Sequence, residues 1–242
     1  MLQSFKNYVF PSQQLRLVLL DFKDLKTFDR IIATSDESLG GFSTVHFDPY
    51  RDEDTGKLCA RFHGNLNLNL PADPKVKDSG WAMFKTKDRQ KRHSFRPFYL
   101  SKRFANFWWD LSTFYAVHLR VKNQTPERKF MINFQTDTSS RTDLFQHRIF
   151  LENNCQWQDV FISFSDFVLT NKGKIQIQYD EEFEKDRVRS VGLSIADKKF
   201  GEYSLLIDTI ECLYGDEYAD KMTQARNNPL LESNSSFSNT LN

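Results

Sequence analysis

The residue types that most often carry catalysis or bind metal ions are scattered along this sequence. The five histidines span about a hundred residues and are His46, His63, His93, His118 and His147. No two of them have the His-x-x-x-His spacing that would put two metal ligands on one helix face. The chain also lacks the Gly-x-Ser-x-Gly, P-loop and Gly-x-Gly-x-x-Gly motifs. We therefore expect no catalytic residue, no metal and no cofactor.

Carboxylates are concentrated in an acidic run at residues 180–186. Their oxygen atoms suit Ca²⁺, but the run lacks the EF-hand pattern, so we interpret it as a solvated loop. An enzyme that uses converging carboxylates and histidines is kept as an alternative hypothesis. The distance between two carboxylates, which decides such chemistry, does not follow from their spacing in the sequence.

The most specific local pattern is the loop that contains Ser35, Asp36, Gly40, Gly41 and Ser43. Two adjacent glycines permit backbone angles that are closed to other residues. The side chains of Ser35 and Asp36 can bond nearby backbone N–H groups and so stabilise a turn. Asp36 could also be an acid or a ligand, but a structural turn needs fewer assumptions.

A basic stretch runs from Lys85 to Arg103, with eight basic residues against one acid, Asp88. Interleaved aromatic residues could let such a stretch bind single-stranded nucleic acid. However, the whole chain has a formal net charge of only +1, and no RNA-binding motif accompanies the stretch. We therefore expect no nucleic-acid partner, and interpret the stretch as a solvated loop or a surface that docks a protein.

The adjacent residues Trp108 and Trp109 follow this stretch directly. In an extended segment they point to opposite faces, so one can fill the core while the other contacts a partner or a sugar ring. The predicted partner surface comprises Lys85, Lys87, Arg89, Lys91, Arg92, Arg96, Trp108 and Trp109.

Strand patterns dominate the rest of the chain. Residues 65–70 alternate asparagine and leucine without a break, which places the leucines on one face and the asparagines on the other. Gly64 before them indicates a bulge or a close approach. We count roughly ten short strands, typical of a sandwich or barrel, and the clearest lie at residues 15–22, 57–62, 117–121, 130–134, 188–195 and 203–212. Short helices are predicted near residues 24–30 and 216–226, and none is long enough for a parallel crossover.

The composition fits one β-rich domain. The chain has 242 residues, 28.5 kDa and 23 phenylalanines, so we expect an aromatic core. Cys59, Cys155 and Cys212 are too few and too scattered for a disulfide framework or a zinc site. No apolar run approaches the roughly 18 residues of a membrane-spanning helix.

Three segments are predicted along the chain. Residues 1–14 form an N-terminal arm or a weak targeting segment, since the first twenty residues are basic, amphipathic and free of acids. Residues 15–214 form the sandwich domain. Residues 215–242 contain a short helix and then a polar, low-complexity tail that we expect to be disordered.

The loop at residues 35–43 resembles the opening motif of the complex I intermediate-associated protein 30 family. Later landmarks follow in the family's order over residues 20–214, although Ser163 stands where the family usually has proline. They include Gly64 in a Phe-x-Gly-x-Leu pattern, the Gly80-Trp81-Ala82 strand, Asp110-Leu111-Ser112, the Trp157 block that contains Phe164 and Phe167, and the closing strands at 190–193 and 207–210.

The resemblance implies a galactose-binding-like β-sandwich, or jelly roll, without a demonstrated enzyme activity. It also implies an assembly factor that binds intermediates of respiratory complex I and other assembly factors. The implied place is the mitochondrial matrix or the inner membrane, with peripheral membrane association, and a cytoplasmic location is the alternative. The rival function is a carbohydrate-binding module, for which an aromatic platform and the amides of Asn65, Asn67 and Asn69 would suffice.

Overall fold

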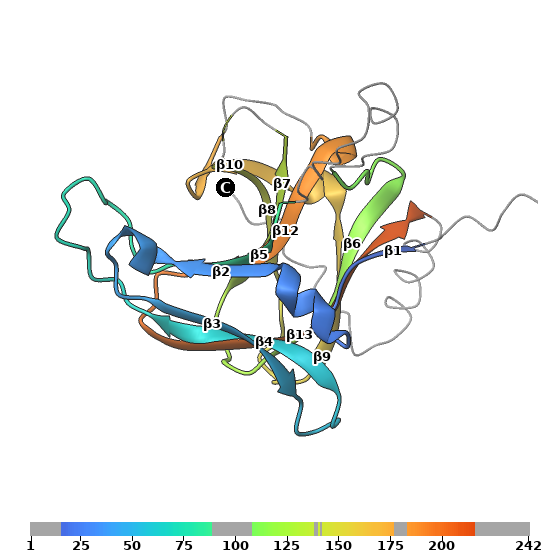
Figure 1. Cartoon of the computed structure of the whole chain (residues 1–242), viewed down its shortest axis with the longest axis horizontal. Helices are drawn as coiled ribbons and strands as arrows, with labels where there is room; N and C mark the ends of the chain where they lie inside the picture. Colours follow the sequence, from blue (N-terminus) through green and yellow to red (C-terminus); the bar gives the residue numbers. More distant parts are fainter. Residues whose placement is uncertain (1–15, 89–107, 138–139, 141, 177–182, 216–242) are drawn as a thin grey trace, which may run out of the picture.

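Two antiparallel β-sheets face each other across an aromatic core. A computed structural model describes residues 16–88, 108–137, 140, 142–176 and 183–215 (Figure 1). We name the six-stranded sheet, in the order β3-β4-β13-β6-β9 with β1 beside β13, sheet A. The seven-stranded sheet, in the order β11-β10-β8-β7-β12-β5-β2, is sheet B. The predicted all-β sandwich is therefore confirmed.

Sheet A is organised around one long strand, β13. On one side β13 pairs with β6, and on the other it pairs first with β4 and then with β1. The strands of sheet A are β1 (Arg16–Asp21), β3 (Thr44–Arg51), β4 (Leu58–Leu66), β6 (Phe114–Asn123), β9 (Trp157–Ser163) and β13 (Gly201–Tyr214).

Sheet B has the shorter strands, and each of the four short helical turns directly precedes or follows one of them in the chain. Its strands are β2 (Ile31–Ser35), β5 (Ala82–Thr86), β7 (Phe130–Thr136), β8 (Asp143–Ile149), β10 (Val168–Asn171), β11 (Lys174–Ile175) and β12 (Val188–Ile195). The helical turns are η1 (Leu25–Arg30), η2 (Asp36–Leu39), η3 (Phe164–Asp166) and η4 (Lys185–Arg187). Among the described residues, no helix is long and apolar enough to cross a membrane.

The core is aromatic, as the phenylalanine content predicts. Phe62 of sheet A packs against Phe84 of sheet B with 5.2 Å between ring centroids, and against Tyr203 at 5.1 Å. All three rings are at most 1% exposed. Ring pairs in these tilted or edge arrangements contribute about 0.5–1.5 kcal/mol each beyond the area that they bury. The alternation of apolar residues along the strands therefore directs one face of each sheet into this core.

Several strand predictions match the structure. The strand predicted at 188–195 coincides with β12, and residues 203–212 lie inside β13. The helix predicted near 24–30 is the turn η1, which Asp24 caps by accepting a hydrogen bond from the backbone of Lys26. The helix predicted at 216–226 and the predicted C-terminal tail lie outside the described residues.

The prediction of one continuous strand over residues 65–70 is wrong. Strand β4 ends at Leu66, which pairs with Gly201, the first residue of β13, so the next residues have no neighbouring strand there. Their polar groups find local partners instead, because Asn69 N–H donates to Asn67 Oδ1 and the Ser79 hydroxyl donates to the Leu68 carbonyl. The leucines do not share a face, since Leu66 is fully buried and Leu70 is 57% exposed.

Candidate functional site

The outer face of sheet A, which points away from sheet B, is unusually rich in polar and charged side chains. Alternate residues of β3, β4, β13, β6 and β9 enter the core, so the residues between them point outward. We name this surface the polar face, and its members are His46, Asp48, Tyr50, Arg61, His63, Asn65, His118, Arg120, Lys122, Trp157, Asp159, Glu202, Ser204, Asp208 and Glu211.

His118 connects three strands on the polar face. Its Nδ1 lies 2.9 Å from Glu211 Oε1 on β13, and its Nε2 lies 2.8 Å from Asp159 Oδ1 on β9. An ionised carboxylate only accepts hydrogen bonds, so the doubly protonated ring satisfies both neighbours. Burial works against the charged ring, but the bonds to Asp159 and Glu211 outweigh it and raise the pKa of His118. The ring of Phe161 stacks on the imidazole with 4.6 Å between centroids.

Asp159 also bonds to the neighbouring cation, Arg120. Arg120 Nη1 lies 2.5 Å from Asp159 Oδ2, and the guanidinium sits 5.8 Å from the centre of the Trp157 ring. Burial alone would raise the pKa of Asp159, but the His118 hydrogen bond and the Arg120 charge lower it. The pairs His118–Asp159 and Arg120–Asp159 therefore hold the edge strand β9 against β6.

Lys122 of the polar face forms a more buried ion pair with Asp52. Lys122 Nζ donates to Asp52 Oδ1 at 2.9 Å, and both side chains are less than a tenth exposed. Asp52 Oδ2 accepts from Thr55 Oγ1 at 2.7 Å and from Trp157 Nε1 at 3.1 Å. Although burial opposes ionisation, these bonds hold the pKa of Asp52 well below its usual range. The β3–β4 connection is thereby fastened to β6 and β9.

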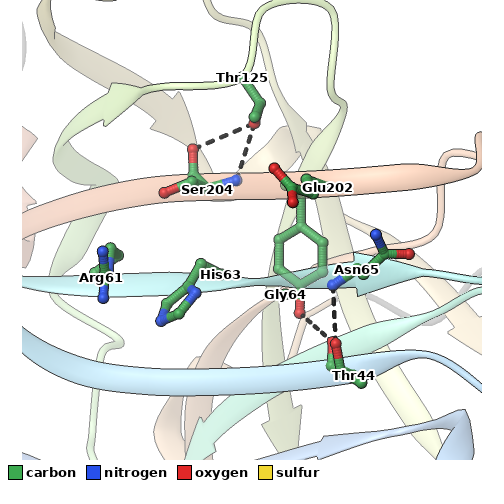
Figure 2. A pocket seen from close by; sticks show the side chains of 9 residues that line it. Thr44, Arg61, His63, Gly64, Asn65, Thr125, Glu202 and Ser204 are labelled. Atoms are coloured by element: carbon green, nitrogen blue, oxygen red, sulfur yellow. Dashed lines mark hydrogen bonds between the residues drawn. The ribbon is translucent and has the colours of Figure 1, made fainter.

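A pocket of about 380 Å³ opens on the polar face, over strands β3, β4 and β13 of sheet A. It lies toward the end of these strands that is farther from Asp52. Figure 2 shows Arg61, His63 and Asn65 along β4, with Thr44 on β3 beside them and Glu202 and Ser204 on β13. The neighbouring pairs Thr44–Asn65, Asn65–Glu202 and His63–Ser204 follow directly from the strand register.

Hydrogen bonds fix the walls of the pocket. Asn65 N–H donates to Thr44 Oγ1 at 3.1 Å, and Ser204 N–H donates to Thr125 Oγ1 at 2.9 Å. The phenol of Tyr203 reaches under β4 and donates to the Thr44 carbonyl at 3.1 Å. The pocket is therefore built on backbone and side-chain bonds that do not depend on a ligand.

The loop at residues 35–43 forms a buried hydrogen-bond network around Asp36. The Asp36 side chain is 0% exposed, and its Oδ1 accepts from Ser43 N–H at 2.8 Å. Its Oδ2 accepts from the Ser43 hydroxyl at 2.8 Å and from Gly80 N–H at 2.5 Å. A Cβ atom on Gly41 would lie 2.6 Å from Asp36 Oδ1, so glycine is needed there. The carboxylate is used inside the protein, joining the loop to the start of β5.

The structure places the predicted partner surface in several different environments. Lys85 lies in β5 of sheet B and bonds to Gln135 Oε1, whereas Lys87 follows the end of β5 and donates through Nζ to the Asp29 carbonyl of η1. Trp109 is only 7% exposed and bridges to Val188, which corrects its assignment to a partner surface. Trp108 is half-buried. The remaining members, Arg89, Lys91, Arg92 and Arg96, lie outside the described residues.

Four of the five residues of the family's structural motif have packing roles. A Cβ on Gly64 would lie 2.1 Å from the Thr44 carbonyl oxygen, which confirms the predicted close approach. Gly80 has φ +77°, and a Cβ there would lie 2.1 Å from Leu68 Cδ2. Phe164 and Phe167 belong to the core, whereas Trp157 lies on the polar face.

Sequence reasoning missed the ion pairs of the polar face. The pattern that could have found them is the alternation of His118, Arg120 and Lys122 with apolar residues, which predicts three cations on one strand face. Their carboxylate partners are 39 to 93 residues away in the sequence. Within the described part of the chain, no group of three or more His, Cys, Asp or Glu side chains is arranged to hold a metal ion.

The fold defines a class of antiparallel β-sandwich that is also found in carbohydrate-binding modules. The family 11 carbohydrate-binding module of the Clostridium thermocellum cellulase Lic26A-Cel5E superposes with a TM-score of 0.54, 15% identity, and coverage of 83% of this chain and 95% of that one. The same kind of module in complex with a mixed-linked tetrasaccharide gives 0.53, 14% identity, and coverage of 82% and 95%. At such low identity the likeness concerns the fold alone.

The sequence comparison is more specific. The model of the Complex I intermediate-associated protein 30 family matches residues 20–207, so the chain belongs to this family. The Neurospora crassa protein called "Complex I intermediate-associated protein 30, mitochondrial" is 32% identical over 195 residues, which cover 73% of this chain and 66% of that protein. The mouse protein of the same name is 25% identical over 88% of this chain and 61% of its own length.

The chain thus spans somewhat less than two thirds of each of these two relatives. The Drosophila melanogaster relative, 29% identical over 86% of this chain and 67% of its own length, is likewise named as mitochondrial. The expected mitochondrial location is therefore confirmed, and the cytoplasmic alternative is not supported.

Proposed function

We propose that this protein is a non-enzymatic assembly factor that binds intermediates of respiratory complex I. The observation that carries the proposal is the family match over residues 20–207, to relatives that are named for association with complex I intermediates. The protein would act by binding subunits or other assembly factors, in the matrix or peripherally at the inner membrane, without nucleic acid and without a cofactor.

The chemistry of the described residues supports a binding role over an enzymatic one. The buried ionisable groups of the described residues are paired with one another, among them Lys122 with Asp52, Arg128 with Asp197, and His118 with Glu211. The buried Asp36 carboxylate accepts only from groups of its own chain. A general acid or base must instead be able to reach a proton on a substrate. These groups are therefore better suited to holding strands together than to proton transfer.

Affinity purification from native mitochondria tests the proposal. We expect the tagged full-length protein to co-purify with complex I subunits and other assembly factors, and to migrate with partially assembled complexes on native gels. A matrix protein of similar size, carrying the same tag, is the control. Deletion of the protein should reduce mature complex I and leave intermediates. Recovery of the tagged protein without any respiratory subunit, together with normal complex I in the deletion strain, would reject the proposal.

The basic stretch remains the predicted docking surface in this proposal. We infer that Arg89, Lys91, Arg92 and Arg96 contact acidic groups of a partner, because the stretch carries eight basic residues against one acid. Changing the four residues to glutamine should weaken co-purification at low salt. The effect should be smaller at high salt, because salt already screens these charges in the wild type. Unchanged co-purification at both salt concentrations would remove this stretch from the docking surface.

A further inference from the structure

The pocket on the polar face has a positive group with unused hydrogen-bonding capacity at one end. The Arg61 guanidinium lies 4.7 Å from the centre of the Tyr50 ring, and its Nη2 is 4.0 Å from Asp48 Oδ2. That carboxylate oxygen is already 2.7 Å from His63 Nε2. The Arg61 side chain as a whole is 35% exposed, although its Nε is buried and, among the described residues, has no hydrogen-bond partner. The terminal amino groups of the guanidinium can therefore donate to a carboxylate that enters the pocket.

A negative group lies at the other end of the pocket. Glu202 is exposed and stands opposite Asn65 in the strand register, four residues along β4 from Arg61. Four residues of extended chain correspond to roughly 13 Å. The hydrogen-bonding side chains of His63 and Ser204 lie between the two charges, and Asn65 lies beside Glu202 (Figure 2). A ligand that matches this row is extended, polar along its length, and oppositely charged at two points.

The pocket is a poor platform for a sugar ring. Sugar recognition would use the open face of an aromatic ring, but the aromatic residue that lines this pocket, Tyr203, is 1% exposed. The nearby Tyr50 ring is covered by the Arg61 guanidinium. The hydroxyl groups of a neutral saccharide would hydrogen-bond to the charges at both ends but would not neutralise them. The lining therefore favours a charged peptide over the oligosaccharides bound by sandwiches of the same class.

We propose that this pocket binds an extended segment of a partner protein, with an acidic side chain against Arg61 and a basic side chain against Glu202. Residues i and i+4 of an extended peptide lie on the same side and about 13 Å apart, which matches the spacing along β4. The polar side chains between the two charges bond to the peptide backbone. This inference rests on the proposed function, because it names the kind of segment that an assembly partner would present.

The test uses the full-length protein and a fluorescent peptide, acetyl-Glu-Ser-Thr-Ser-Lys-amide, in anisotropy titrations at low salt. We expect saturable binding that weakens about fivefold or more when either charged residue of the peptide becomes glutamine. A shorter peptide, acetyl-Glu-Ser-Lys-amide, should bind worse because its charges cannot reach both groups. Absence of saturable binding up to about 1 mM peptide, or equal binding of the uncharged peptide, would overturn the proposal.

Variants of the protein locate the binding site. Arg61→Gln and Glu202→Gln should each weaken the charged peptide about fivefold, whereas Arg148→Gln on β8 and Glu37→Gln on η2 should have no effect. The Arg61→Glu variant should prefer a peptide with lysine at both charged positions, which a general loss of folding would not produce. Equal effects of the pocket and control variants, or competition by cellotetraose, would contradict a peptide site at this pocket.

The pocket can fail as a peptide site while the assembly role remains valid. If Arg61→Gln and Glu202→Gln capture complex I intermediates as well as the wild type does, the pocket is rejected as a peptide site and the assembly role is retained. If the wild type binds the peptide at the pocket but captures no respiratory subunit, the assembly role is rejected. The pocket would then be a peptide site for another partner protein.

Discussion

The buried carboxylate of Asp36 is the clearest case of one residue that determines a local structure. It accepts hydrogen bonds from the backbone and hydroxyl of Ser43 and from Gly80 N–H, 44 residues away. Each buried donor that loses its acceptor costs about 1–3 kcal/mol. The loop at 35–43 and the start of β5 are therefore held together by one side chain.

Asp36→Asn should lower the free energy of unfolding by about 2–4 kcal/mol, because an amide NH₂ replaces one acceptor oxygen and faces N–H and O–H donors. Urea unfolding followed by circular dichroism would measure this change. Glu37→Gln is the matched control, since Glu37 is an exposed neighbour, and it should change the free energy by less than about 0.5 kcal/mol. Equal stability of Asp36→Asn and wild type would show that the hydrogen-bond network around Asp36 contributes little to the free energy of unfolding.

His118 should make stability depend on pH. Its pKa is raised in the folded protein by Asp159 and Glu211, despite burial, so its stabilising contribution is complete below the unfolded pKa of about 6.5. That contribution is lost as pH rises through the folded pKa. His118→Gln should therefore lower the free energy of unfolding by roughly 2–4 kcal/mol at pH 6 and by less at pH 9.

Urea titrations of wild type and His118→Gln at both pH values provide the measurement. Asp159 titrates in the opposite sense, since its lowered pKa contributes stability that is lost only as pH falls through acidic values. Between pH 6 and pH 9 the contribution of Asp159 to the free energy of unfolding therefore stays constant, and a change in this range reports on His118. A difference between the two proteins that is larger at pH 9 would contradict a charged His118.

At the scale of elements, glycine allows strands β3, β4 and β13 to approach one another. The Tyr203 phenol passes beside Gly64 to reach the Thr44 carbonyl, so the space that a side chain would take is already occupied. The carbonyl oxygen belongs to the backbone of β3 and cannot rotate away. The register of the three strands and the floor of the pocket both depend on this contact.

Gly64→Ala should destabilise the protein by about 1–3 kcal/mol, because its Cβ would lie 2.1 Å from the Thr44 oxygen and the strands would have to separate. Gly215→Ala is the control, since its Cβ would meet Tyr115 Cδ2 at an ordinary 3.6 Å. Thermal unfolding of the two variants beside wild type measures the difference. Equal melting temperatures would mean that the sheet accommodates the methyl group without cost.

At the scale of the whole molecule, the aromatic core joins segments from residue 19 to residue 212. Strands β1 and β13, from opposite ends of the described chain, pair directly. This closure supports the predicted domain at residues 15–214, which remains a prediction.

A protein limited to residues 15–214 should therefore unfold in one cooperative transition, with a melting temperature within a few degrees of the full chain. Calorimetry of the two proteins would test it. A truncated protein that lacks a cooperative transition would place part of the folding unit in residues 1–14 or 215–242. The predicted boundaries would then be too narrow.

The sequence by itself determined the class of fold and the family. Period-two alternation predicts strands such as β12, and the abundance of phenylalanine predicts the aromatic core, because both depend on local composition and spacing. The same local rule fails at residues 67–70, where alternation continues but no strand lies alongside. Alternation describes which side a residue would face and does not supply the hydrogen-bonding partner that makes a strand.

Only the tertiary structure decided where the charges meet. His118 and Glu211 are 93 residues apart and Lys122 and Asp52 are 70 apart, yet each pair is in contact across sheet A. The pocket likewise takes Arg61 from β4 and Glu202 from β13, residues that are 141 positions apart in the chain. Strand order and register bring such residues together, and these depend on how the whole chain closes around its core.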